Sequence, residues 1–191
     1  EGLEEAVAHF RRYARPVVGD FQHGPSAGRR AGPDRHRAAG PQGVPGVGQE
    51  VAQDLAQAVR KASRTRVIAI TGSAGKTTTK EAIAEFLSGR FRVVRNKGNL
   101  NNHIGLPLSL LQLRERPDVA VMELGMNHAG EISTLVAIAD PDTRVWTNVG
   151  DAHIGFFASP DAIADAKAEI LERADRDALL VCNADDPRVI A

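Results

Sequence analysis

A short loop rich in glycine and threonine constrains the fold of this chain more than any other stretch. The loop, residues 71–79, reads T-G-S-A-G-K-T-T-T. An apolar, strand-like run at 67–70 precedes it, and a helical pattern at 81–87 follows it. Glycines let the backbone turn its N–H groups around an anion, and the N-terminus of a helix adds positive potential. The sequence therefore predicts a phosphate-binding loop.

The loop differs in spacing from the general pattern G-x-x-x-x-G-K-S/T. Ile70 stands where that pattern has its first glycine, and Gly72 comes two residues later. We therefore interpret the loop as a shorter variant. In this interpretation Lys76 reaches the β- and γ-phosphates of a nucleotide, and the Thr77 hydroxyl contacts Mg²⁺. The alternative is a G-K-T sequence that occurs by chance at the start of a helix.

Composition restricts the class of protein further. The 191 residues suffice for one domain or slightly more, and 24 basic residues balance 24 acidic ones. This balance argues against a nucleic-acid or membrane-surface partner. Cys182 is the single cysteine and lies in an apolar run that indicates core. Apolar runs are too short to span a bilayer, and the N-terminus lacks a basic signal region. We expect a cytoplasmic monomer.

The segment at 20–50 has a different composition from the rest. It contains seven glycines, four prolines and four arginines, but no Leu, Ile, Met, Trp or Tyr. Such a segment buries too little apolar area to offset its ordering entropy, which predicts a disordered linker. A nucleic-acid-binding arm is disfavoured because aromatic residues are not interleaved with the arginines. A third interpretation is that part of residues 15–50 is an out-of-frame translation or a degraded segment, since Gly, Pro, Ala and Arg are products of GC-rich codons in any reading frame.

From residue 51 onward, strand and helix patterns alternate. This alternation predicts an α/β fold with a doubly wound, mostly parallel sheet, and ligands at the carboxyl ends of its strands. Ser159 is an expected N-cap, with Pro160 in the first helical turn. The expected strands are 66–70, 91–94, 119–124, 144–149 and 178–182, and the expected helices are 51–61, 77–88, 106–113, 131–139 and 160–173.

Two polar residues follow or end expected strands. Glu123 ends the apolar run 119–122, so its carboxylate lies near the expected phosphate loop and is a candidate metal ligand. Its alternative role is a capping or salt-bridged glutamate. His153 lies five residues after Asn148, which ends another strand. On pattern alone, His153 is equally well explained as an ordinary loop histidine.

Lys167 falls on the apolar stripe of the last long helix. It lies four residues after Ile163 and three before Ile170. One explanation is that the apolar stem packs inward while the ammonium reaches water. The other is a desolvated lysine with a lowered pKa, which reacts with CO₂ to form a carbamate that can bind a metal ion.

Six ordered motifs between residues 51 and 189 together resemble the Mur ligase family. The short loop is typical of the whole family, whereas the K-E after the threonines and the N-N-x-I-G-x-P-L segment are most similar to the branch that uses D-alanyl-D-alanine. The motifs are T-G-S-A-G-K-T-T-T-K-E at 71–81, N-N-H-I-G-L-P-L-S-L-L at 101–111, E-L-G-M-N-H-A-G-E-I at 123–132, T-N-V-G-D-A-H at 147–153, A-K-A-E-I at 166–170 and N-A-D-D-P at 183–187.

The resemblance implies roles for individual residues. The catalytic residues would be Lys76, Lys167 and His153, and Lys167 would be carbamylated and bridge toward a second Mg²⁺. The first Mg²⁺ would be bound by Thr77, Glu123 and His153. The residues implied to hold ATP are Gly72, Ser73, Ala74, Gly75, Lys76, Thr77 and Thr78 around the phosphates, Asn102 beside the phosphate and substrate site, and Asn183 facing the adenine.

The resemblance also implies an activity. This is the ATP- and Mg²⁺-dependent joining of UDP-N-acetylmuramoyl-tripeptide to D-alanyl-D-alanine through an acyl phosphate, in peptidoglycan precursor synthesis. A sister Mur or folylpolyglutamate-type ligase and a nucleotide-binding fragment without turnover remain alternatives. In a three-domain ligase, residues 51–191 would be the central ATP-binding domain, truncated at its C-terminal end, and 1–50 a remnant of the N-terminal one. With the C-terminal domain absent, no turnover is expected from this chain alone.

Overall fold

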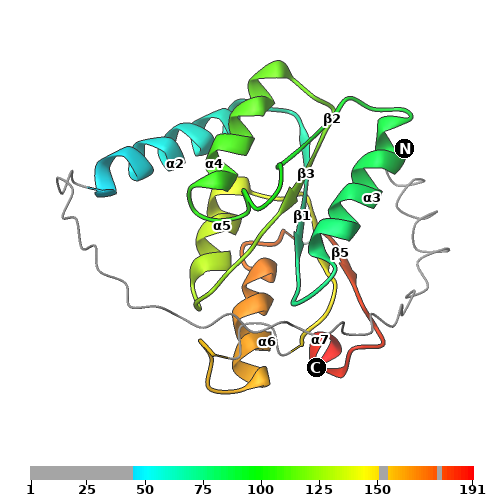
Figure 1. Cartoon of the computed structure of the whole chain (residues 1–191). Coiled ribbons are helices and arrows are strands. Elements are labelled where there is room, and N and C mark those ends of the chain that lie inside the picture. The colour runs from blue at the N-terminus through cyan, green and yellow to red at the C-terminus, as the bar shows by residue number, and fades with distance from the viewer. Residues whose placement is uncertain (1–44, 151–154, 176–177) are drawn as a thin grey trace, which may run out of the picture. The chain divides into compact units, whose positions relative to one another are not determined.

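The computed structural model describes residues 45–150, 155–175 and 178–191. They belong to one compact unit, Val44–Ala191, built on a five-stranded parallel sheet (Figure 1). The strand order is β2-β3-β1-β4-β5. This confirms the predicted α/β fold and parallel sheet. The strands are β1 (Arg66–Thr71), β2 (Val93–Arg95), β3 (Val119–Glu123), β4 (Thr143–Trp146) and β5 (Leu179–Cys182).

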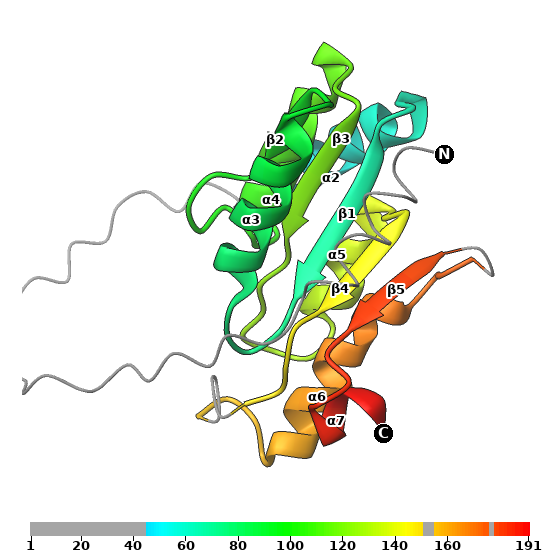
Figure 2. The same cartoon turned by 90° about the vertical axis from the view of Figure 1, so that its right-hand side faces the viewer.

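The three central strands are buried on both faces, as their continuous apolar runs predict. Their register aligns the strand ends: Ile70 pairs with Glu123, and Thr71 pairs with Trp146. The loops that follow β1, β3 and β4 therefore leave the sheet at one edge, which lies at the bottom of Figure 1. Figure 2 shows the twist of the sheet from the side.

Helices cover both faces of the sheet. Helix α3 lies on one face, while α2, α4 and α5 lie together on the other (Figure 1). None of the described helices is long and apolar enough to cross a bilayer. The helices are α2 (Pro45–Ala62), α3 (Lys76–Ser88), α4 (Gly105–Leu110), η1 (Leu111–Glu115), α5 (Glu131–Ala139), α6 (Pro160–Ala168), η2 (Glu169–Leu171) and α7 (Pro187–Ile190).

Several expected boundaries agree with the structure and others shift for local reasons. Helix α5 has the predicted ends, and the Ser159 hydroxyl accepts a hydrogen bond from the Ala162 N–H as the predicted N-cap. Strand β2 begins two residues later than expected, because the Phe91 N–H completes the last turn of α3 by donating to the Leu87 carbonyl. The expected helix 160–173 is shorter, because it tightens into η2 after Ala168.

Two further differences concern the ends of the described unit. Helix α2 begins at Pro45, within the stretch whose composition predicted disorder, and proline suits a first helical turn. The prediction that Cys182 lies in the core is wrong, because this thiol is exposed. Strand β5 is the last strand in the order, and its residues alternate between half-buried and exposed. An apolar run at an edge strand therefore does not imply burial on both faces.

Candidate nucleotide-binding site

The phosphate loop adopts a backbone that requires glycine at two places. Gly72 has φ 147° and Gly75 has φ 78°, conformations that other residues adopt only with strain. A Cβ atom at Gly72 would lie 1.9 Å from the Thr147 hydroxyl oxygen, so the loop also packs tightly against the end of β4. The two glycines thus account for the sharp turn and for the close approach between β1 and β4.

The start of α3 presents free donors beside this turn. Gly75 is its N-cap and provides no side-chain acceptor, so the first N–H groups of the helix lack partners within it. Two other loop N–H groups are held from behind: Ser73 donates to the Asn148 carbonyl at 3.0 Å, and Ala74 donates to Asn148 Oδ1 at 2.8 Å. The segment after β4 therefore fixes the loop and leaves the helix N-terminus to bind an anion.

Lys76 lies at the first position of α3 and folds over the loop. Its Nζ donates to the Gly72 carbonyl at 2.8 Å. Burial lowers the pKa of Lys76, and the negative charge of Glu123 opposes this effect. The ammonium group thus lies beside the loop, where a phosphate would replace a weak neutral partner with a strong charged one.

Glu123 is brought to the same place from the end of β3. Its side chain is buried, with the residue only 3% exposed. Oε2 accepts a hydrogen bond from the Thr77 hydroxyl at 2.7 Å, and Oε1 accepts one from Asn101 Nδ2 at 2.8 Å. These are neutral donors, and no ion pair to Glu123 is found within the described ranges. A carboxylate and a hydroxyl oxygen side by side are suited to Mg²⁺, which usually takes one or two carboxylates, water and substrate phosphates.

Lys167 is 1% exposed, so its side chain lies almost entirely inside the protein. In the part of the chain that the structure describes, no hydrogen bond or ion pair to Lys167 Nζ is found. Burial and, to a smaller extent, the nearby charge of Lys76 together lower its pKa to about 8. Of the two explanations for Lys167, the desolvated lysine agrees with this environment and the solvent-reaching side chain does not.

The remaining expected site residues have other partners or fall outside the structure. Asn102 is exposed, and its Oδ1 accepts from the N–H groups of Ile104 and Gly105 at the start of α4. Asn183 accepts from the Asp185 N–H in the turn after β5. His153 lies outside the described residues. The sequence thus placed Asn102 in the site, whereas its neighbour Asn101 makes the contact with Glu123.

Sequence reasoning also missed two groups that shape this site. Asn96, directly after β2, hydrogen-bonds the main chain of Glu123. Asp186 accepts from the Val149 N–H at 2.7 Å and so ties the turn after β5 to the segment after β4. The available signal was position, since each lies within a few residues of a strand end.

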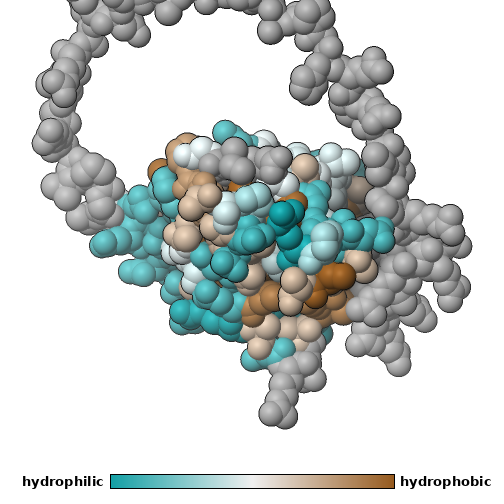
Figure 3. Space-filling model, turned by 90° about the horizontal axis from the view of Figure 1, so that it is seen from below, coloured by the Kyte–Doolittle hydropathy of each residue, from teal (hydrophilic) through white to brown (hydrophobic). Residues whose placement is uncertain are grey.

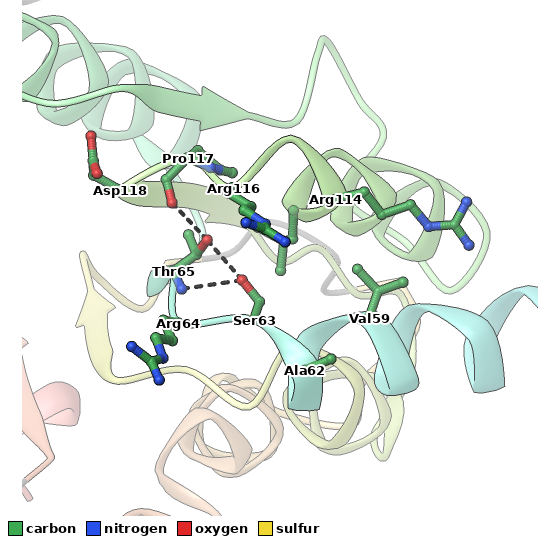
Figure 4. A pocket seen from close by; sticks show the side chains of 10 residues that line it. Val59, Ala62, Ser63, Arg64, Thr65, Arg114, Arg116, Pro117 and Asp118 are labelled. Atoms are coloured by element: carbon green, nitrogen blue, oxygen red, sulfur yellow. Dashed lines mark hydrogen bonds between the residues drawn. The ribbon is translucent and has the colours of Figure 1, made fainter.

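The surface at this edge is mostly hydrophilic, with a hydrophobic area to one side (Figure 3). A cavity of about 730 Å³ opens at the opposite edge, next to the residues that precede β1 and β3 (Figure 4). Its hydroxyl groups are bonded within the protein: Thr65 donates to the Pro117 carbonyl, and Ser63 donates to Thr65. Parallel sheets bind ligands at the carboxyl ends of their strands, so we take the loop edge as the site.

A parallel α/β sheet with a glycine turn, an uncapped helix N-terminus, a lysine and a buried carboxylate at its carboxyl edge has the features of the P-loop class of proteins. The model of the Mur ligase middle domain matches residues 70–191. The chain belongs to the Mur ligase family. The match covers the loop and every strand after β1.

Individual relatives agree with this assignment. The UDP-N-acetylmuramoyl-tripeptide–D-alanyl-D-alanine ligase of Bacillus subtilis is 45% identical over 135 residues, which cover 71% of this chain and 30% of that protein. A crystal structure of MurF from Acinetobacter baumannii has 38% identity and a TM-score of 0.71, over 74% of this chain and 31% of that one. MurF ligase from Thermotoga maritima in complex with ADP has 32% identity and a TM-score of 0.70, over 80% of this chain and 36% of that one. The chain spans about a third of the length of these relatives.

Proposed function

We propose that this chain provides the ATP-binding site of a ligase that joins D-alanyl-D-alanine to UDP-N-acetylmuramoyl-tripeptide. The observation that carries the proposal is the cluster of Lys76, Thr77 and Glu123 beside the uncapped start of α3. The names of the relatives from Bacillus subtilis and Acinetobacter baumannii support the substrates, and the ADP complex of the Thermotoga maritima enzyme supports the nucleotide. Such a reaction belongs in the cytoplasm, where ATP is available.

The residues of the cluster divide the work of binding and activating the nucleotide. The N–H groups at the start of α3 and the Lys76 ammonium bind the phosphates, and the ammonium stabilises charge on the γ-phosphoryl group as the substrate carboxylate attacks it. Thr77 and Glu123 would hold Mg²⁺. The metal ion supplies further neutralisation of the phosphates when it is bound. The amine of D-alanyl-D-alanine then displaces phosphate from the acyl phosphate.

Lys167 is the residue that we propose for carbamylation. Its burial and its position beside Lys76 favour the neutral amine. The Nζ lone pair forms a bond to the carbon of CO₂, one C=O π bond becomes a carboxylate, and Nζ releases a proton. The product carries a negative charge, which suits a site next to Lys76 and a metal ion better than a second ammonium does. A ¹³C-labelled carbamate signal in bicarbonate buffer that is lost in Lys167→Arg tests this step.

Calorimetry of Mg²⁺-ATP binding tests the nucleotide site. Lys76→Ala should weaken binding by on the order of 10- to 100-fold, because a hydrogen bond from a charged donor is lost. Lys61→Ala removes an exposed lysine from the last turn of α2 and should leave affinity unchanged. Equal binding by the chain and by Lys76→Ala would reject the loop assignment.

Because no turnover is expected from this chain alone, an assay of ADP release tests the ligase step in a full-length ligase that contains this chain as its ATP-binding domain. Release should require both UDP-N-acetylmuramoyl-tripeptide and D-alanyl-D-alanine. Stimulation by D-alanyl-D-alanine favours the proposed reaction. Stimulation by a single amino acid in its place would identify a sister ligase and reject the proposed amine substrate.

A further inference from the structure

Asn96 is a fully buried asparagine, 0% exposed, that follows the last residue of β2. Its side-chain amide contacts both main-chain groups of Glu123. Asn96 Oδ1 accepts from the Glu123 N–H at 2.9 Å, and Asn96 Nδ2 donates to the Glu123 carbonyl at 2.9 Å. The same Nδ2 donates to the Leu100 carbonyl at 2.9 Å. Both N–H donors of this amide and its oxygen are therefore bonded to main-chain groups.

These contacts replace a missing strand neighbour. Strand β2 pairs with β3 up to Arg95 and Val121, so the ladder ends before it reaches Glu123. On the other side, Glu123 pairs with Ile70 of β1. The amide of Asn96 presents one acceptor and one donor as a peptide group would, and so continues the ladder from Val121 to Glu123, two residues further. Since the Leu124 N–H donates to the Ile70 carbonyl of β1, the end of β3 is held from both sides at the point where the Glu123 carboxylate faces Thr77.

Asn96 is held in turn by α3, the helix that carries Thr77. Lys80 Nζ donates to the Asn96 carbonyl at 2.7 Å, and Lys80 is 0% exposed. Glu81 Oε1 lies 3.1 Å from Lys80 Nζ, and Glu81 Oε2 lies 2.8 Å from Arg95 Nε. Lys80 and Glu81, which are neighbours on α3, therefore contact Asn96 and Arg95 at the end of β2.

We propose that Asn96 and Lys80 are positioning residues, which together fix the Glu123 carboxylate relative to Thr77. Helix α3 contacts Glu123 by two routes: directly through the Thr77 hydroxyl, and through Lys80 and the Asn96 amide. The second route sets where the main chain of Glu123 lies, and the first sets where its Oε2 points. The proposal rests on the proposed function, in which Thr77 and Glu123 hold Mg²⁺ beside a nucleotide.

The test separates metal binding from nucleotide binding. ADP affinity is measured by calorimetry on the unmodified chain with excess Mg²⁺ and again in EDTA, and the ratio gives the contribution of the metal ion. Asn96→Ala and Lys80→Met should each reduce this ratio by about tenfold or more, the usual effect of losing a group that orients a metal ligand. Their ADP affinity in EDTA should change by less than about twofold, because the loop and Lys76 are intact.

Thr65→Val is the matched control for loss of a buried hydrogen bond. Thr65 is 3% exposed and donates to the Pro117 carbonyl at 2.7 Å, before β1 begins. Thr65→Val should lower the free energy of unfolding and leave unchanged the ratio of ADP affinity with Mg²⁺ to ADP affinity in EDTA. If Asn96→Ala and Lys80→Met behave in the same way, they are only structural and the proposal is overturned.

Two further measurements keep the outcomes distinct. In Glu123→Ala, ADP should bind equally well with Mg²⁺ and in EDTA, because a metal ligand is lost. If ADP binding to the unmodified chain does not depend on Mg²⁺ at all, the proposed function and this inference both fail. If ADP affinity no longer depends on Mg²⁺ in Glu123→Ala but still depends on it fully in Asn96→Ala and Lys80→Met, only this inference fails. Should both variants fail to fold, the Asn96 side-chain NH₂ signals of the unmodified chain are followed in ¹⁵N spectra. They should shift when Mg²⁺ is added to the ADP complex, and unchanged signals overturn the proposal.

Discussion

Arg60 and Lys167 are both buried cations, but they lie in opposite kinds of environment. Arg60, near the start of β1, donates to the carbonyls of Ala139, Asp140 and Thr65 and forms an ion pair with Asp142 at 3.0 Å. Lys167, beside Lys76 of the phosphate loop, has no such partner among the described residues. Buried charge is costly unless it is paired and hydrogen-bonded. The contacts of Arg60 therefore offset the cost of its burial, whereas the burial of Lys167 is not offset by a partner among the described residues.

The largest expected effect follows from removing the paired cation. Arg60→Met leaves the Asp142 carboxylate and several carbonyls without their donor, so the free energy of unfolding should fall by about 3–5 kcal/mol. Arg66 also lies near Asp142, at 3.7 Å, but its side chain is 64% exposed. Arg66→Met should cost about 1 kcal/mol or less. Urea unfolding of both variants measures this difference, and equal losses would contradict the role assigned to Arg60.

Removing the unpaired cation, Lys167, should raise the free energy of unfolding rather than lower it. Protonated Lys167 pays for desolvation in the folded state, so Lys167→Met should raise the free energy of unfolding at pH 7. The folded-state pKa of about 8 lies below the usual 10.5. The desolvation penalty is therefore complete below pH 8. It is relieved between pH 8 and 10.5, where the folded state has lost the proton and the unfolded state still holds it. At about 1.4 kcal/mol per pH unit, the penalty amounts to about 3 kcal/mol.

Unfolding in CO₂-free buffer across this pH range measures the effect of Lys167→Met. The advantage of the variant should shrink as pH rises from 8 to 10.5. Lys61→Met, at an exposed lysine, should show no such dependence on pH. A Lys167→Met variant that is less stable than the unmodified chain at pH 7 would show that the ammonium has a stabilising partner.

The two glycines of the loop should differ in their sensitivity to alanine. Gly72→Ala places a Cβ atom 1.9 Å from the Thr147 hydroxyl oxygen, so it should cost about 2–3 kcal/mol through overpacking. At Gly75 no atom lies within 4 Å of the new Cβ, and only the left-handed backbone, φ 78°, is strained. Gly75→Ala should cost about 1 kcal/mol. Thermal unfolding compares them, and a reversed order would contradict the packing of the loop against β4.

The smallest effect is expected at a capping residue that contacts no ligand. Ser159→Ala removes the acceptor for the Ala162 N–H and should cost about 1 kcal/mol of unfolding free energy. Ser159→Asp keeps an acceptor at the N-cap and should restore most of the loss. ADP affinity should be the same in both variants. A drop in affinity would place the start of α6 in the site rather than in its scaffold.

Local patterns predicted much of the fold. The strand before the loop, the glycine turn and the helix after it follow from residues that are neighbours in sequence. The same is true of α5 and of the cap at Ser159. These features depend on periodicity, capping and backbone freedom, which a short window of sequence contains. The positions of Lys76, Thr77 and Glu123 beside one another were also expected, because strand ends meet at one edge of a parallel sheet.

Other features could not be derived from neighbouring residues. The exposure of Cys182 depends on the place of β5 at the end of the strand order. The contact between Asn101 and Glu123, which the sequence did not predict, depends on how the loop before α4 passes the end of β3. Asn96 resembles any polar residue after a strand until its amide is seen between the main-chain groups of Glu123.

The sequence by itself determined the class of fold, the phosphate loop and the family, because each depends on local patterns or on the order of motifs. Only the tertiary structure decided which buried charges are paired. Arg60 meets Asp142 across 82 positions of sequence, and Thr77 meets Glu123 across 46. Such pairs form when strand order and register bring distant segments together, and burial then changes the energy of each charge. The free energy of a buried cation depends on its three-dimensional neighbours, which the identity of the residue does not specify.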